Sequence, residues 1–208
     1  MPKIHDVDQL NTLHLDVLRE IGNIGSGNAT TALAKLINKK IDMGVPKVNV
    51  LEFKHVADLL GGADTEVIGI LFNLSGDITG MMMFVLDQRS VRILVNLLMG
   101  REVHDDEAFT DLDLSALQEI GNILAGSYLS SLASLTNLKI APSIPYMAQD
   151  MAGAILSVPA IEFGKIGDKA LFIETEFIEG HDQVSGYFIL IPEMTSFNKI
   201  LNALGVWS

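Results

Sequence analysis

The chain has 208 residues, of which 49% are hydrophobic and 19% are charged, and this balance excludes a globally disordered protein. Fourteen Lys and Arg residues stand against 26 Asp and Glu, so the net charge is −12 and nucleic-acid binding is not expected. The absence of cysteine excludes disulfides, thiolate nucleophiles and cysteine-ligated zinc.

The sequence gives no sign of a targeting segment or a membrane span. The first ten residues, MPKIHDVDQL, lack the basic and then apolar pattern of a secretory signal peptide. The most apolar stretch, residues 67–86, is interrupted by four polar residues, Asn73, Ser75, Asp77 and Thr79. We interpret this stretch as a buried hairpin and expect a cytoplasmic protein without membrane insertion.

A long amphipathic helix is predicted from residue 13 to residue 36. Its apolar side, on a 3.6-residue period, consists of Leu13, Val17, Leu18, Ile21, Ile24, Ala32 and Leu36. The opposite side carries four residues at spacings of four, three and four, namely Asp16, Glu20, Asn23 and Gly27. Because such residues are neighbours on a helix, a carboxylate is expected beside a carboxamide on the side away from the core.

The chain after this helix is predicted to turn at Pro46 and to continue through a short connecting segment, residues 54–62. Two strands and a helix that ends at Gly100 follow, and the polar residues 101–110 form a natural link to the second half.

The second half repeats the first. Residues 18–46 align with residues 117–145 at an offset of 99 without a gap, and about half of the aligned positions are identical. Its long helix carries the same polar row at the same spacings, Ser115, Glu119, Asn122 and Gly126, opposite the apolar residues Leu114, Leu117, Ile120, Leu124 and Leu135. Its connecting segment, residues 149–160, is expected to form a fuller helix.

The duplication predicts one domain over residues 1–208, with internal repeats at about 8–100 and 107–205. The fold class expected is α/β or mixed α+β, with long helices packed on a β-sheet and the repeats related by a pseudo-two-fold axis. Two independent domains of about 100 residues are the alternative.

A solvated helix face would explain one Glu–Asn pair, but the pair occurs twice while neighbouring polar positions differ. Close helix packing could explain Gly22 and Gly121, which lie nearer the apolar side, but not Gly27 and Gly126. A carboxamide cannot act as a base near neutral pH, yet it can orient a water molecule, and a carboxylate can pair with a cation of a partner.

At these residues the sequence resembles the CheC family of chemotaxis proteins, which includes CheX and FliY as relatives. The family pattern is an Asp or Ser, three residues, a Glu, two residues, an Asn, twenty-two residues and a Pro. Two sets of residues match this pattern, namely Asp16, Glu20, Asn23 and Pro46, and then Ser115, Glu119, Asn122 and Pro145.

The resemblance implies a phosphatase that acts on the phospho-aspartate of the response regulator CheY. Asn23 or Asn122 would orient the attacking water, and Glu20 or Glu119 would form a salt bridge with the lysine of the receiver domain. The receiver would bring its own Mg²⁺, so no metal site or cofactor of this chain is expected.

The resemblance also implies a second partner, the receptor deamidase CheD, which we place on a helix that begins near Asp150 and Met151. The alternative is a non-catalytic binding module that regulates CheD, or a scaffold related to the flagellar switch. The sequence does not rank the two sites, which differ locally at Asp16 against Ser115 and at Gly25 against Leu124.

Overall fold

The computed structural model describes residues 12–44, 47–101, 108–163, 169–179 and 182–206, so Pro46 lies outside the described residues. Helix, strand, strand, helix, strand, strand and helix follow one another twice along the chain. The first series consists of α1 (Thr12–Ile37), β1 (Asp42–Met43), β2 (Lys47–Glu52), α2 (Phe53–Leu59), β3 (Glu66–Gly76), β4 (Gly80–Asp87) and α3 (Gln88–Met99). The second consists of α4 (Asp111–Thr136), β5 (Ile140–Pro142), β6 (Tyr146–Met151), α5 (Ala152–Phe163), β7 (Lys169–Glu179), β8 (Asp182–Pro192) and α6 (Met194–Ala203).

One eight-stranded antiparallel sheet contains strands of both halves. Its order is β1-β7-β8-β4-β3-β5, with β2 also paired to β7 and β6 also paired to β3. Each half therefore gives its first two strands to the sheet edge of the other half, and β4 pairs with β8 between them. This exchange confirms a single domain of mixed α and β structure, whereas the repeat boundaries stay a prediction.

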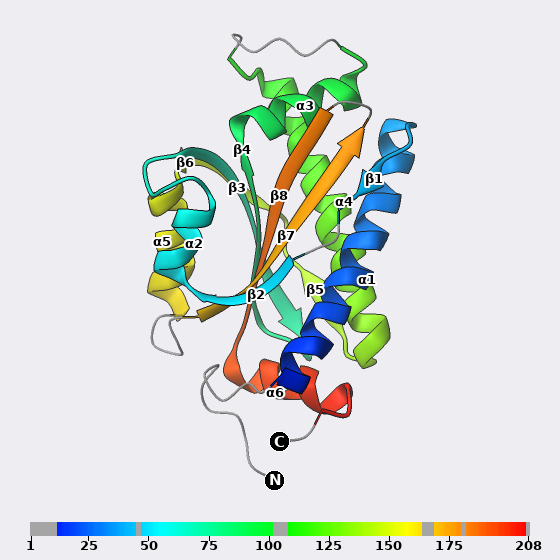
Figure 1. Ribbon diagram of the computed structural model, residues 1–208, viewed down its shortest axis with the longest axis vertical. Helices are drawn as coiled ribbons and strands as arrows, with labels where there is room; N and C mark the ends of the chain where they lie inside the picture. The colour runs from blue at the N-terminus through cyan, green and yellow to red at the C-terminus, as the bar shows by residue number, and fades with distance from the viewer. Residues whose placement is uncertain (1–11, 45–46, 102–107, 164–168, 180–181, 207–208) are drawn as a thin grey trace.

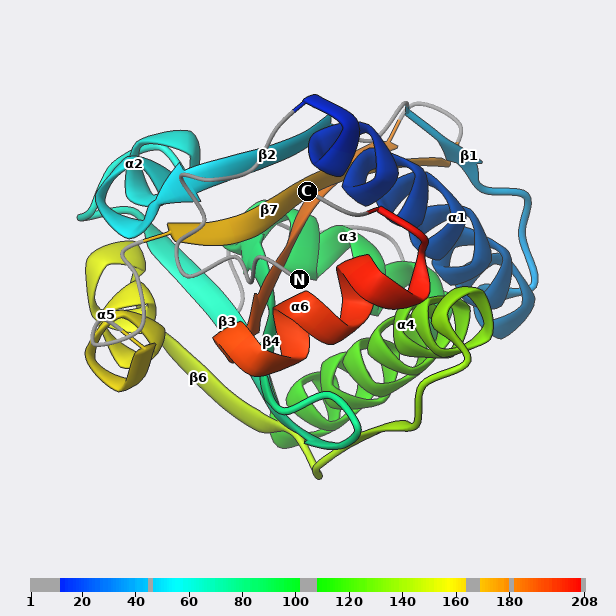
Figure 2. The same ribbon diagram turned by 90° about the horizontal axis from the view of Figure 1, so that it is seen from below.

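The helices lie on both faces and at both ends of the sheet (Figure 1). Helices α1 and α4 lie side by side on one face, and Figure 2 shows α2 and α5 on the opposite face. The larger core cluster joins the sheet to α1, α3, α4 and α6, and a smaller one joins it to α2 and α5. Strand β4 is buried on both sides, since Met82 and Phe84 belong to the larger cluster and Met81, Met83 and Val85 to the smaller.

The hairpin predicted within residues 67–86 is confirmed as β3 and β4, which pair from Val67 with Asp87 to Leu74 with Gly80. None of the helices in the described ranges is both long enough and apolar enough to cross a membrane.

Strands β2 and β6 were not predicted, because a turn at proline and a connecting segment were expected there. The edge formed by β5 and β6 contains a bulge opposite β3. Pro142 pairs with Leu74 and Tyr146 pairs with Leu71, so three residues of the edge lie opposite two residues of β3. Pro145 lies in this bulge, where a residue without an N–H is tolerated. Strand β6 is mostly exposed, and it therefore lacks the alternation of apolar and polar residues that identifies a strand.

The fuller helix expected in the second connecting segment is confirmed as α5, which begins at Ala152, so Asp150 and Met151 lie just before it and end β6. The exposure of two apolar residues of the long helices was predicted wrongly. Leu13 and Leu135, expected on the core side, are 57% and 39% exposed, because they lie in the first turn of α1 and the last turn of α4.

Helix α4 begins with a capping box. The backbone N–H of Asp113 donates to the Thr110 hydroxyl at 3.2 Å, and the Asp113 carboxylate accepts from the Thr110 backbone N–H at 2.9 Å. The guanidinium of Arg101 also donates to this carboxylate, and Asp113 is almost fully buried. The Thr110 N–H, with help from Arg101, holds the pKa of Asp113 below its ordinary value of 3.8, against the opposing effect of desolvation.

Replacing Asp113 should therefore destabilise the protein in a pH-dependent way. Asp113→Ala is expected to lower the free energy of unfolding by about 1–2 kcal/mol at pH 7. Because the folded pKa is lowered, this contribution is present above the ordinary pKa and is lost as the pH falls through the folded value. Denaturant titrations at neutral and acidic pH would measure it, with the exposed Asp111→Ala as the control. A difference that does not change with pH would contradict this account.

Gly25 and Tyr128 fit together where α1 packs on α4. A Cβ atom at Gly25 would lie 2.5 Å from the ring of Tyr128, so only glycine leaves room for this ring. The ring is fully buried and stacks on Phe188 at 5.5 Å between centroids. In the sequence alignment, Gly25 and Ala29 of the first repeat correspond to Leu124 and Tyr128 of the second. The second repeat thus has two large side chains where the first has two small ones, and the Tyr128 ring occupies the space that Gly25 leaves open.

Gly25→Ala should lower the free energy of unfolding by about 1–3 kcal/mol through overpacking, although alanine favours the helix. Combining it with Tyr128→Leu should recover part of this loss. Tyr128→Phe alone is expected to be neutral or stabilising, because the buried hydroxyl has no hydrogen-bond partner among the described residues. Denaturant titration of the three variants tests this, and a Gly25→Ala variant as stable as the wild type would refute the packing argument.

Candidate functional site

The two polar rows lie on the solvent-facing sides of α1 and α4, as the helical spacing predicts. Asp16, Glu20 and Asn23 are exposed on α1, and Gly27 is half-buried. Their counterparts on α4 have the same exposure, namely Ser115, Glu119, Asn122 and Gly126. Each row therefore presents its carboxylate and carboxamide to an incoming partner.

The two rows form separate sites. Helices α1 and α4 run antiparallel (Figure 1), and Asn28 donates to the Ser131 hydroxyl across their interface at 2.8 Å. Asn23 lies five residues from this contact in one direction and Asn122 nine residues in the other, so at a rise of about 1.5 Å per residue they are about 20 Å apart along the helices. The structure thus does not combine the two Glu–Asn pairs into one centre.

The four candidate side chains have no fixed partner in the part of the chain that the structure describes. Glu20, Asn23, Glu119 and Asn122 make no side-chain hydrogen bond or ion pair with another residue in the ranges that the structure describes. An exposed polar group without a fixed partner can bind a second protein without first breaking an internal bond.

The surroundings of the two pairs differ. On α1, the Asp16 carboxylate pairs at 2.8 Å with Arg19, the residue that precedes Glu20 in the sequence. On α4, Gln118 takes the place of Arg19, and the Ser115 hydroxyl donates to the carbonyl of Asp111 at 2.8 Å. The first residue of the family pattern therefore interacts within its own helix in both rows, and only the α1 row has a positive charge at this point.

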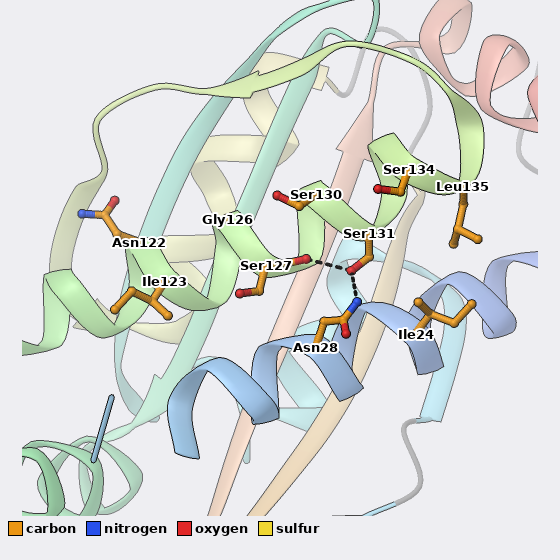
Figure 3. A pocket seen from close by; sticks show the side chains of 10 residues that line it. All are labelled: Ile24, Asn28, Asn122, Ile123, Gly126, Ser127, Ser130, Ser131, Ser134 and Leu135. Carbon is orange, nitrogen blue, oxygen red and sulfur yellow. Dashed lines mark hydrogen bonds between the residues drawn. The ribbon is translucent and has the colours of Figure 1, made fainter. Parts of the chain in front are cut away.

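An open groove of about 590 Å³ runs along α4 from Asn122 toward the helix end (Figure 3). One row of its lining continues the candidate site at four-residue intervals and consists of Asn122, Gly126, Ser130 and Ser134. A second row faces α1 and consists of Ile123, Ser127, Ser131 and Leu135. From α1, Ile24 and Asn28 complete the lining.

Hydrogen bonds fix the floor of this groove. Asn28 donates to the Ser131 hydroxyl, which in turn donates to the Ser127 carbonyl at 2.8 Å. Sequence reasoning missed these residues, although the four-residue spacing of Ser130 and Ser134 beyond Asn122 was a usable signal.

The remaining predicted residues lie apart from the Glu–Asn pairs. Pro145 belongs to the bulge on the sheet edge, and its counterpart Pro46 is not described. Asp150 and Met151 are exposed at the end of β6, where the chain enters α5 on the other face of the sheet (Figure 2). No group of three or more His, Asp and Glu side chains suited to a metal ion occurs within the described residues.

Comparisons with known proteins match the two helix segments that carry the polar rows. A model of the CheC-like family matches residues 13–50 and 112–145, the segments that contain both Glu–Asn pairs. The CheY-P phosphatase CheC of Bacillus subtilis is 40% identical over 195 residues, which are 92% of this chain and 93% of that protein.

Solved structures share the fold. The structure of FliY from Thermotoga maritima has a TM-score of 0.76 and 24% identity, and the match covers 95% of this chain and 98% of that one. A CheX–CheY–BeF₃–Mg²⁺ complex from Borrelia burgdorferi has a TM-score of 0.52 and 16% identity, over 83% of this chain and 96% of that one. With extensive identity to one curated member and both polar rows inside the matched segments, this chain belongs to the CheC family.

Proposed function

We propose that this chain is a phosphatase that hydrolyses the aspartyl phosphate of the response regulator CheY in the cytoplasm. The exposed Glu–Asn pair, present on both α1 and α4, carries the proposal. The 40% identity to a CheY-P phosphatase over nearly the whole chain supports the same substrate. The CheX structure that shares the fold was solved with CheY.

Asn23 and Asn122 act by placing water. In the reaction, water oxygen forms a bond to phosphorus, the bond between phosphorus and the aspartyl oxygen breaks, and the aspartate carboxylate and inorganic phosphate are released, with the water protons kept by phosphate and solvent. A carboxamide can accept from the water and donate to a phosphoryl oxygen, which aligns the water with the breaking bond. Alignment of this kind contributes on the order of a hundredfold in rate.

Glu20 and Glu119 act by docking. Each lies one turn before its Asn on the same face, so a salt bridge to the receiver lysine sets where the Asn enters. The receiver supplies Mg²⁺, which neutralises charge on the phosphoryl group when bound there. Neither Glu nor Asn becomes phosphorylated, because neither attacks phosphorus.

Decay of ³²P-labelled CheY-phosphate tests the function directly. The wild type should accelerate decay, Asn23→Ala and Asn122→Ala should each retain part of this rate, and the double variant should show only spontaneous decay. Asn202→Ala, an exposed substitution on α6, serves as the control and should match the wild type. If wild type and double variant both leave the spontaneous rate unchanged, with and without CheD, the chain is a non-catalytic binding module.

CheD binding is proposed for the opposite side of the sheet. Exposed apolar residues gather at the end of β6 and on α5, and they are Met151 at 50%, Val158 at 47% and Ile161 at 77% exposure. Val158 also lines a pocket of about 300 Å³ between α5 and the sheet. This surface faces away from α1 and α4, so CheD and CheY could be bound together (Figure 2).

Met151→Asp and Asp150→Ala are expected to weaken CheD binding at least tenfold, because they introduce or remove charge on this surface, and to leave phosphatase activity unchanged. Isothermal titration with CheD measures the effect, and Ile144→Asp, also highly exposed, is the control for a surface charge elsewhere. Unchanged CheD affinity in both variants would place CheD on another surface.

A further inference from the structure

The long helices contain two kinds of glycine. At Gly25 and Gly121 a Cβ atom would lie 2.5 Å from the Tyr128 ring and 2.7 Å from the Ile70 side chain, so internal packing requires glycine there. At Gly27 and Gly126 a Cβ atom would meet no atom of the described residues within 4 Å. Neither of these two has a positive φ, so backbone conformation does not require glycine either.

Gly27 and Gly126 weaken their helices without a packing reason among the described residues. Alanine in a helix interior favours the folded state by about fivefold over glycine at each position. The sequence nevertheless keeps glycine at both positions, while the packing glycine Gly25 is replaced by Leu124 in the second half. The constraint on Gly27 and Gly126 therefore comes from outside the chain.

Their position indicates what imposes it. Each glycine follows its Asn by four residues, one helical turn further on the same face, and Figure 3 shows Gly126 between Asn122 and Ser130. Both are partly exposed. A missing side chain at this point lets another protein's surface come into contact with the helix backbone.

We propose that Gly27 and Gly126 are positioning residues, against whose bare backbone the receiver domain of CheY packs. This contact sets how far Asn23 and Asn122 reach toward the phosphoryl group, and it rests on the proposed function. A methyl group there would hold the receiver back by about 1 Å or more, and a displacement of that size costs on the order of a hundredfold in rate.

The test uses single-site proteins, with Gly126→Ala placed in a Glu20→Ala/Asn23→Ala background and Gly27→Ala in a Glu119→Ala/Asn122→Ala background, so that the other row can neither dock nor act. Each glycine variant should unfold at higher denaturant concentration than its background, yet show at least tenfold lower kcat/KM toward CheY-phosphate. Affinity for CheY loaded with beryllofluoride and Mg²⁺ should also fall at least tenfold. The control, Asn202→Ala, also replaces a poor helix former by alanine on an exposed helix surface. It should leave both kcat/KM and the affinity for CheY unchanged.

Opposite results overturn the proposal. Glycine variants that are more stable but keep full affinity and kcat/KM would show that no partner contacts these backbones. Variants that are less stable would show an internal packing role instead. Failure of the function itself is distinguishable: the wild type would then not accelerate decay, whereas the affinity for beryllofluoride-loaded CheY still reports on the two glycines.

Discussion

The exchange of edge strands between the two halves is the constraint on which the rest of the molecule depends. Strands β1 and β2 pair with β7, and β5 and β6 pair with β3, so each half completes the sheet of the other. In the described part of the chain, these strands form their ladder hydrogen bonds across this exchange. It fixes α1 and α4, which immediately precede the exchanged strands, side by side on one face (Figure 1).

Because the two helices are fixed in this way, each has an inner side that packs on the sheet and an outer side that is exposed to solvent. The inner side of each helix joins the larger core cluster, whereas on the outer side Glu20, Asn23, Glu119 and Asn122 make no side-chain bond to any residue that the structure describes. A rigid helix on a sheet holds such side chains more accurately than a loop does, and the water-orienting role proposed for Asn23 and Asn122 requires accurate placement. The two docking surfaces proposed for CheY and CheD lie on opposite faces of the same sheet.

The long helices and the buried hairpin could be predicted because their apolar periods are strong, and the Glu–Asn spacing alone placed both pairs on solvent-facing surfaces. Strand β6 could not be predicted, since an exposed edge strand has no buried face to impose alternation on its sequence. The groove beside Asn122 was also missed, because its lining joins residues from two helices. The fit of Tyr128 against Gly25 is a property of three-dimensional packing that neither residue shows in sequence.

The packing of the Tyr128 ring against Gly25 distinguishes this duplicated chain from a dimer of two identical halves. Two copies of the first half would set Gly25 against Ala29 of the other copy and leave a cavity where the Tyr128 ring now lies. Two copies of the second half would press Tyr128 against Leu124 and overpack the same interface. A homodimer of either half would therefore lose the packing of this interface, so the two halves have become complementary to each other and no longer equivalent.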